Sequence, residues 1–193
     1  MAIQYSRKNL LSDLTLLIVV GLMGFGLYHF LMRPLSRAWK SHYYRNQPPI
    51  AVGTPIDDSW SVQNLTGSET IQISNLKGKV IFLNFWASWC APCRMELPSI
   101  ENLYQQYKNT DVVFLCVSGE SWAQVQYFAQ KQKIQIPLYV VEKFPSFFKV
   151  KLLPTTYIVA RSGKIALSTT SPSYWDKKGV TDFLDSLLAE KAQ

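Results

Sequence analysis

The sequence predicts an α/β domain, in which a mixed central sheet is flanked by helices, behind one apolar N-terminal helix. Two runs, at residues 80–85 and 111–117, are short, apolar and rich in β-branched residues, as expected for buried central strands. A segment with helical spacing of its apolar residues follows each run. Strands that alternate with helices in this way build a sheet covered by helices.

The elements around the first central strand follow from apolar spacing and from turn residues. A strand at residues 71–76 leads through the turn Lys77-Gly78-Lys79 into the central strand. A helix begins at Cys90 and resumes past Pro98, which removes a backbone donor and should kink the first part of the helix. The buried stripe expected for this helix consists of Ile100, Leu103, Tyr104 and Tyr107.

The second half of the chain continues the alternation. A helix over about residues 122–133 is expected to bury Trp122, Val125, Phe128 and Ala129. Residues 137–141 are a candidate strand, and residues 144–150 a short helix or turn. A hairpin joins strands at residues 155–160 and 164–168, with Gly163 in its turn. The last helix, at residues 176–189, has an apolar face formed by Val180, Phe183, Leu184, Leu187 and Leu188.

The net charge of +7 belongs mostly to the N-terminal extension. Residues 1–49 contain six Lys or Arg and one acid, whereas the remaining chain contains fourteen bases and twelve acids. No basic stripe therefore marks the domain as a nucleic-acid binder. The apolar content of 48% is sufficient for one well-filled core, and three cysteines are too few for a disulfide scaffold.

The apolar N-terminal segment begins at Leu14, ends at Met32 and contains no Lys, Arg, Asp or Glu. A helix of this length rises about 28 Å, close to the roughly 30 Å thickness of a bilayer's hydrocarbon core. A cleavable signal peptide would have a shorter apolar core followed by small residues, and a buried core helix would have a one-sided apolar stripe. We therefore expect an uncleaved single-pass membrane anchor.

Four parts are expected: a short N-terminal segment (1–13), the transmembrane helix (14–32), a juxtamembrane linker (33–49) and the folded domain (50–193). Pro48 and Pro49 end the linker, where they stop helix propagation. The charges do not settle the orientation, because Arg7 and Lys8 precede the span and four bases follow it. The positive-inside rule, taken literally, leaves the domain in the cytoplasm or its side undecided.

Cys90 and Cys93 stand two residues apart at a strand-to-helix junction, an arrangement suited to thiol–disulfide exchange. The partial positive charge of a helix N-terminus lowers the pKa of the first thiol, and the second can resolve a mixed disulfide. The same two-residue separation of cysteines also occurs in one half of a zinc site, so a metal site is the alternative interpretation. However, Cys116 is isolated in an apolar run and both histidines lie far upstream, so the sequence predicts neither a metal site nor a cofactor.

Five segments match one family pattern in order. Residues 77–90 (KGKVIFLNFWASWC) follow L-K-G-K-V-V-x-x-N-F-W-A-x-W-C, and residues 91–98 (APCRMELP) follow x-P-C-x-x-E-x-P. Residues 136–138 (IPL) stand where this family has a strand after an insertion. Residues 153–158 (LPTTYI) follow P-T-T-F-L-I, and residues 161–165 (RSGKI) follow R-x-G-K-I. Together, over about 140 residues, they resemble the membrane-anchored TlpA/ResA-like branch of thiol–disulfide oxidoreductases, which implies a thioredoxin fold.

This resemblance implies that Pro154 is a cis-proline that faces the redox pair. From the sequence alone, a trans proline that opens a strand is the simpler interpretation. With the cis bond, the backbone of Leu153 would lie open beside Cys90, where an extended substrate segment can pair with it. Leu153, Pro154 and Thr155 are therefore expected to bind substrate together with Trp89.

The resemblance also implies a catalytic role for Glu96, one helical turn after Cys93. In the wider thioredoxin family a buried Asp in the central strand helps to deprotonate the second cysteine. Asn84, which cannot titrate, takes that place here. A partly buried Glu96 would have a raised pKa and would exchange a proton with Cys93 near neutrality. The alternative is a solvated helix acid without a role.

Three further residues, Trp86, Trp89 and Cys116, each allow more than one interpretation. Trp86 and Trp89 are expected to shield the pair and to offer substrate an apolar surface, although Trp86 is equally compatible with the core. Cys116 is expected to be a small core hydrophobe rather than a third redox centre.

The resemblance thus implies a membrane-tethered enzyme that reduces disulfides of exported proteins through Cys90 and Cys93, for example in cytochrome c maturation. A membrane electron donor would re-reduce the pair. The expected location is the bacterial inner membrane, with the catalytic domain on the exported, periplasmic side. Two alternatives stay open: an oxidase or isomerase that uses the same pair, and a tethered adaptor that binds clients without catalysis.

Overall fold

The structure, a computed structural model, describes residues 19, 21–26, 28, 30, 50–65 and 67–191. The chain divides into two units, Met1–Gln47 and Pro48–Gln193, and each is described by itself. In the first unit the described residues are helical and exposed. Much of the predicted span from Leu14 to Met32, and all of the predicted linker at residues 33–49, lie outside the described residues. Among the residues that are described, no helix combines the length and the apolar character that crossing a bilayer requires.

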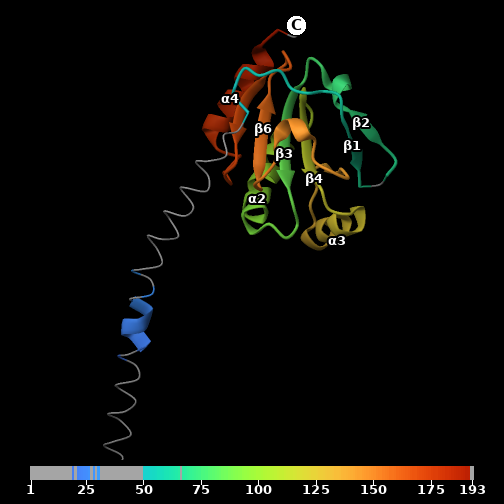
Figure 1. The fold of residues 1–193 in the computed structure, drawn as a ribbon. Helices are drawn as coiled ribbons and strands as arrows, with labels where there is room; N and C mark the ends of the chain where they lie inside the picture. The colour runs from blue at the N-terminus through green and yellow to red at the C-terminus, as the bar shows by residue number, and fades with distance from the viewer. Residues whose placement is uncertain are drawn as a thin grey trace, which may run out of the picture. The chain divides into compact units, whose positions relative to one another are not determined.

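In the described part of the second unit, seven strands form one mixed sheet in the order β2-β1-β5-β4-β3-β6-β7 (Figure 1). β3 runs parallel to β4, and β4 parallel to β5, whereas β6 is antiparallel to β3 and β7. β1 is antiparallel to β5 and β2. The strands are β1 (Ser61–Asn64), β2 (Thr70–Gln72), β3 (Val80–Trp86), β4 (Val112–Ser118), β5 (Leu138–Val140), β6 (Thr155–Val159) and β7 (Ile165–Thr169). The predicted mixed α/β sheet is confirmed.

β3 lies at the centre of the sheet, and all seven of its residues are buried. Because successive side chains of a strand point to opposite faces, its apolar residues supply two cores. Phe82 and Trp86 belong to the core on one face, and Leu83 and Phe85 to the core on the other. An uninterrupted apolar run is therefore what this position requires, with Asn84 as the one polar exception.

In the described part of the second unit, the α-helices are α2 (Ala91–Tyr107), α3 (Trp122–Gln132) and α4 (Lys178–Ala189). All three contribute to the same core, for example through Leu97, Val125 and Leu184. Along the sheet, β4 lies beside β3 and β5 lies beside β4, so both connections move the chain in the same direction across the sheet. Because connections between parallel strands are right-handed, α2 and α3 cover the same face. Two 3₁₀ helices, η1 (Ile73–Leu76) and η2 (Ser146–Phe148), help to cover the opposite face. The sequence predicted a sheet flanked by helices, and on this face the described flanking helices are short 3₁₀ helices.

Several local expectations need correction. The strand expected at residues 71–76 ends at Gln72, because Ile73 and Leu76 use the three-residue period of a 3₁₀ turn to face inward. β1 escaped prediction because Val62 is its only buried residue among polar neighbours. Trp122 is exposed rather than buried, and its indole N–H donates to the carbonyl of Leu65. The remaining strands and helices were predicted to within a few residues.

Within α2, the helix continues through Pro98 as a single element from Ala91 to Tyr107. Its buried face includes Ile100, Leu103 and Tyr107, as expected, whereas Tyr104 is only half-buried. The same face carries Cys93 and Glu96 beneath the first two turns. The core contacts of α2 thereby position the two residues that matter most for the site.

Candidate active site

Cys90 is the N-cap residue of α2, directly after the loop that follows β3. Its N–H donates to the carbonyl of Ala87 at 3.1 Å, and its Sγ accepts the N–H of Cys93 at 3.2 Å. A helix N-terminus supplies such unpaired N–H groups and a partial positive charge. Both effects stabilise a thiolate at Cys90, so this sulfur is suited to act as a nucleophile.

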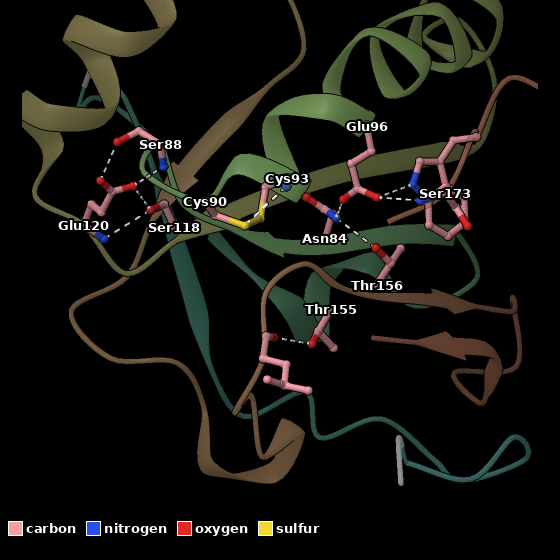
Figure 2. The surroundings of a disulfide bond; sticks show 12 residues. Asn84, Ser88, Cys90, Cys93, Glu96, Ser118, Glu120, Thr155, Thr156 and Ser173 are labelled. Atoms are coloured by element: carbon pink, nitrogen blue, oxygen red, sulfur yellow. Dashed lines mark hydrogen bonds between the residues drawn. A yellow bond between two sulfur atoms is a disulfide. The ribbon is translucent and has the colours of Figure 1, made fainter. Parts of the chain in front are cut away.

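Cys90 and Cys93 form a disulfide, with their Cα atoms 5.3 Å apart (Figure 2). Cys90 retains an exposed fraction of 4%, whereas Cys93 is fully buried. An incoming partner therefore reaches the sulfur of Cys90 first. Cys93 is placed to attack the Cys90 sulfur from inside the protein.

The two tryptophans beside the pair occupy different environments. Trp86 is fully buried at the end of β3, with its ring 5.5 Å from the ring of Phe128. It is therefore a core residue, which resolves the alternative left open by the sequence. Trp89, immediately before Cys90, has an exposed fraction of 71% and presents a large apolar surface. Its contact with substrate stays a prediction.

Glu96 is buried beneath α2, with an exposed fraction of 2%. Its Oε1 accepts a hydrogen bond from Asn84 Nδ2 at 2.9 Å. Its Oε2 accepts two, from the N–H of Ser173 at 3.1 Å and from Nε1 of Trp175 at 3.0 Å. Burial raises the pKa of Glu96, although the three donors act in the opposite direction. The interpretation of Glu96 as a solvated helix acid is therefore wrong.

A small hollow of about 90 Å³ connects Glu96 to the surface. Its other lining residues are Met95, Pro172, Ser173 and Tyr174. Met95 and Tyr174 are largely exposed. The hollow gives the Glu96 carboxylate a short route to solvent.

Asn84, on β3, connects the carboxylate to the sheet. Its Nδ2 also donates to Oγ1 of Thr156 on β6, at 2.8 Å. Figure 2 shows the Asn84 amide between Cys93 and Glu96. The position beneath Cys93 thus holds an amide that cannot titrate, and the titratable group, Glu96, is one helical turn away.

The segment before β6 contains the cis peptide bond predicted between Leu153 and Pro154. Pro154 is buried and Leu153 half-buried. Thr155 is buried, and its hydroxyl donates to the carbonyl of Leu152 at 2.7 Å (Figure 2). The side chain of Thr155 is thus engaged within the protein, and a role of these residues in binding substrate stays a prediction.

Sequence reasoning missed a carboxylate that ties down the loop before Cys90. Glu120 accepts the N–H and the hydroxyl of Ser88, both at 2.6 Å, and the hydroxyl of Ser118 at 3.1 Å (Figure 2). Ser118 ends β4, and Glu120 follows two residues later. The parallel strands β3 and β4 end at the same edge of the sheet, so polar residues after both apolar runs were a usable signal.

The partners of Glu96 in the loop after β7 were also missed. Trp175 is buried, its ring lies 5.0 Å from that of Phe82, and its backbone N–H donates to Oγ of Ser99. The loop is therefore fixed to α2 by Ser99 and Glu96 together. In the sequence, the only indication of these partners is the tryptophan within the polar run SPSYWDKK.

Cys116, on β4, is fully buried and pairs in register with Asn84. Burial raises the pKa of its thiol strongly, and the nearby Glu96 and Glu101 carboxylates add to the effect. A neutral, inaccessible thiol behaves as a small apolar side chain. The predicted core position of Cys116 is confirmed.

A mixed sheet that presents a Cys-x-x-Cys disulfide at a helix N-terminus, above a buried carboxylate, defines a thiol–disulfide oxidoreductase of the thioredoxin fold. The comparisons with known proteins agree with this class. The chain belongs to the AhpC/TSA family, whose model matches residues 52–168, and it is a ResA-like member.

Two curated relatives and one solved structure illustrate the similarity. The chain is 29% identical to the thiol-disulfide oxidoreductase ResA of Geobacillus kaustophilus, over 82% of this chain and 85% of the relative. It is 32% identical to the thioredoxin-like protein YneN of Bacillus subtilis, over 82% and 87%. A putative thiol:disulfide interchange protein DsbE from Chlorobium tepidum is 25% identical, with a TM-score of 0.63 over 72% of this chain and 99% of the other. The chain is thus an enzyme of this class, with a redox-active cysteine pair.

Proposed function

We propose that the chain is a membrane-tethered reductase of disulfides in exported proteins, with apocytochrome c before haem attachment as one client class. The observation that carries the proposal is that the N-terminal end of α2 holds both a reactive sulfur and a buried carboxylate. The sulfur of Cys90 accepts the N–H of Cys93, a bond that would stabilise a thiolate there in the dithiol form, and Glu96 supplies a buried carboxylate one turn further on. Such a site can both attack a disulfide and release the product.

The first step is the attack of the Cys90 thiolate on one sulfur of a client disulfide. The client S–S bond breaks, a mixed disulfide with Cys90 forms, and the second client sulfur leaves as a thiolate that takes up a proton. Solvent water can supply this proton.

The second step is the resolution of the mixed disulfide by Cys93. Glu96, in its ionised form, takes the proton of the Cys93 thiol, and the Cys93 thiolate attacks the sulfur of Cys90. The mixed disulfide breaks, the Cys90–Cys93 disulfide forms, and the second client sulfur leaves as a thiolate that takes up the proton held by Glu96. A membrane electron donor would return two electrons and two protons to the pair and so close the cycle.

The client segment would lie in extended form along the backbone of Leu153 and Pro154, with Thr155 completing this wall. Trp89 supports this proposal because it directly precedes Cys90 and its side chain is exposed. Backbone pairing gives affinity for many sequences, and one aromatic contact adds area without strict selection.

The reductase activity is tested with insulin disulfides as the probe. Replacement of Cys90 by Ser should abolish the reduction, whereas replacement of the buried Cys116 by Val should preserve it. Retained activity of Cys90→Ser would overturn the proposal. Unchanged client binding by a Cys90/Cys93 double variant, with no loss of function in the cell, would favour a tethered adaptor instead.

The direction of the reaction is tested by equilibration of the pair with glutathione. A reductase requires a low potential, and a value well above the roughly −180 mV of protein disulfide isomerase would favour an oxidase or isomerase. Clients are identified with Cys93→Ala, which stalls the mixed disulfide at Cys90. Recovery of exported cysteine-containing proteins, apocytochrome c among them, is the expected result.

The tether is proposed from the charge-free apolar run that begins at Leu14 and ends at Met32. We place the domain on the periplasmic side of the bacterial inner membrane, where exported clients fold. A reporter that is active only outside the cytoplasm, fused after Gln193, should be active. Cytoplasmic reporter activity would overturn this topology, and release of the chain by a high-salt wash would overturn the tether.

A further inference from the structure

The buried amide of Asn84 has one polar atom without a partner. Its Nδ2 donates twice, to Oε1 of Glu96 at 2.9 Å and to Oγ1 of Thr156 at 2.8 Å. Its Oδ1 accepts no hydrogen bond from the residues that the structure describes, and the residue is fully buried. Buried carbonyl oxygens without a donor are rare and unfavourable in folded proteins, so this one requires a physical explanation.

The direction of the oxygen follows from the bonds of the nitrogen. A reversed amide would place Oδ1 against the Glu96 carboxylate and the Thr156 hydroxyl, with Nδ2 left over. Glu96 follows Cys93 by one turn on the same face of α2, so an amide that donates to Glu96 lies beneath that turn. Figure 2 shows the free oxygen of Asn84 on the side of Cys93.

In the disulfide form Cys93 has no proton, and it therefore cannot donate to this oxygen. In the dithiol form Cys93 has an S–H, which is a weak donor. We propose that Asn84 is a positioning residue of the redox cycle: its Oδ1 accepts the S–H of Cys93 in the dithiol, while its Nδ2 holds Glu96. The inference rests on the proposed cycling of Cys90 and Cys93.

The consequence is a bias in the equilibrium between the two redox forms. Reduction supplies the missing partner of Oδ1, and oxidation removes it. The amide therefore favours the dithiol and limits how strongly reducing the pair is. In the dithiol form, the Asn84 amide would lie between the Cys93 thiol and the Glu96 carboxylate that receives its proton.

The other groups around the amide do not supply the missing bond. Cys93 and Glu96 face it from α2, and Cys116 is its register neighbour on β4. Thr156, from β6, has a hydroxyl that accepts from Nδ2. Burial raises the pKa of the Cys116 thiol, so Cys116 keeps its proton near neutrality, but among the described residues its S–H makes no hydrogen bond to Oδ1.

The equilibrium with glutathione tests the proposal in the full chain. One protein dithiol and one glutathione disulfide give one protein disulfide and two glutathione thiols. Asn84→Leu removes the oxygen at similar volume and should shift this equilibrium about tenfold toward the protein disulfide, or about 30 mV to lower potential. The control Thr156→Val removes only the second acceptor of Nδ2 and should leave the equilibrium unchanged.

Asn84→Leu also removes one donor to Glu96, so the same comparison is made in a Glu96→Gln background. A shift that persists there belongs to Oδ1 and supports the proposal, whereas a shift that disappears assigns the effect to Glu96 and overturns it. Equal equilibria in the wild type and Asn84→Leu also overturn it. A chain that does not exchange with glutathione at all contradicts the proposed redox function instead.

A second measurement needs no substitution at Asn84. Infrared spectra of the reduced wild type contain the S–H stretching band of Cys93, identified by its loss in Cys93→Ser. A hydrogen bond to Oδ1 should move this band to lower wavenumber than that of a free thiol, and Thr156→Val should leave it in place. An unshifted Cys93 band would overturn the proposal.

Discussion

The indole N–H of Trp175 donates to Oε2 of Glu96 at 3.0 Å, across 79 residues of sequence. The same oxygen accepts the N–H of Ser173. Through these bonds, the loop after β7 adjusts a carboxylate on the helix that carries the cysteine pair. The proton affinity of Glu96 is therefore a property of the tertiary structure, and it can be altered from outside α2.

Replacement of Trp175 by Phe should raise the pKa of Glu96 further. The ring packing against Phe82 is largely kept, but one charge-assisted hydrogen bond to the carboxylate is lost. Such bonds contribute about 1.5–3 kcal/mol, which corresponds to roughly 1–2 pKa units. The pKa is measured from the carboxyl carbon shift of Glu96 by NMR.

The matched control for this change is Trp60→Phe. It removes an indole N–H that donates to the carbonyl of Asp57, and Trp60 packs against the core on the opposite face of the sheet. The Glu96 titration should not move in this control. A pKa of Glu96 that is the same in Trp175→Phe and the wild type would contradict the prediction.

Glu96→Gln should slow the resolution of the mixed disulfide by about 10²-fold at neutral pH, because Gln cannot accept the Cys93 proton. In the wild type the rate should rise with pH through the raised pKa of Glu96, since the ionised form is the base. The variant should lack this rise. Stopped-flow measurement of client release across pH checks both points, with the exposed Glu142→Gln as control.

The stability of the oxidised chain should depend on pH through the same group. Because the folded state raises the pKa of Glu96, it binds this proton more tightly than the unfolded chain does. The contribution of Glu96 to the free energy of unfolding should therefore fall as pH rises from about 4.5 through the folded pKa. Urea unfolding of the wild type and Glu96→Gln at matched pH isolates this slope, and a constant difference between them would refute it.

Glu120→Gln should loosen the loop that precedes Cys90. An amide has one acceptor oxygen where the carboxylate has two, and it carries no charge, so the hydrogen bonds from Ser88 and Ser118 lose their charge assistance and one of them loses its acceptor. The expected loss in the free energy of unfolding is about 1–3 kcal/mol. Hydrogen exchange at the Ser88 amide should accelerate. Protection equal to that of the wild type would show that the loop is held by other contacts.

Cys116→Val should leave insulin reduction intact and change the free energy of unfolding by less than about 1.5 kcal/mol, as expected for a swap of similar volume in the core. In the native chain Cys116 should resist alkylation, because it is fully buried and burial raises the pKa of its thiol. Mass spectrometry after iodoacetamide treatment checks the second point. Modification of Cys116 in the folded dithiol form would revive its interpretation as a third redox centre.

Much of the fold was predictable because it depends on local patterns. β3 is buried on both faces, so its apolar run is continuous, and α4 has the one-sided stripe of a helix on a sheet. β1 and η1 were not predicted well, since each has very few buried residues and lies at the periphery. That α2 and α3 cover the same face of the sheet depends on the strand order, and the sequence of neither helix specifies that order.

By itself, the sequence determined the chemistry of the pair: two cysteines one turn apart at a helix start, with Glu96 one turn further on. Helical spacing alone is enough to bring these three residues together. Only the tertiary structure decided how that chemistry is tuned, because the partners of Glu96 come from β3 and from the loop after β7. It also left Oδ1 of Asn84 without a donor beneath Cys93. Hydrogen bonds between distant segments have no period in sequence, so only packing reveals them.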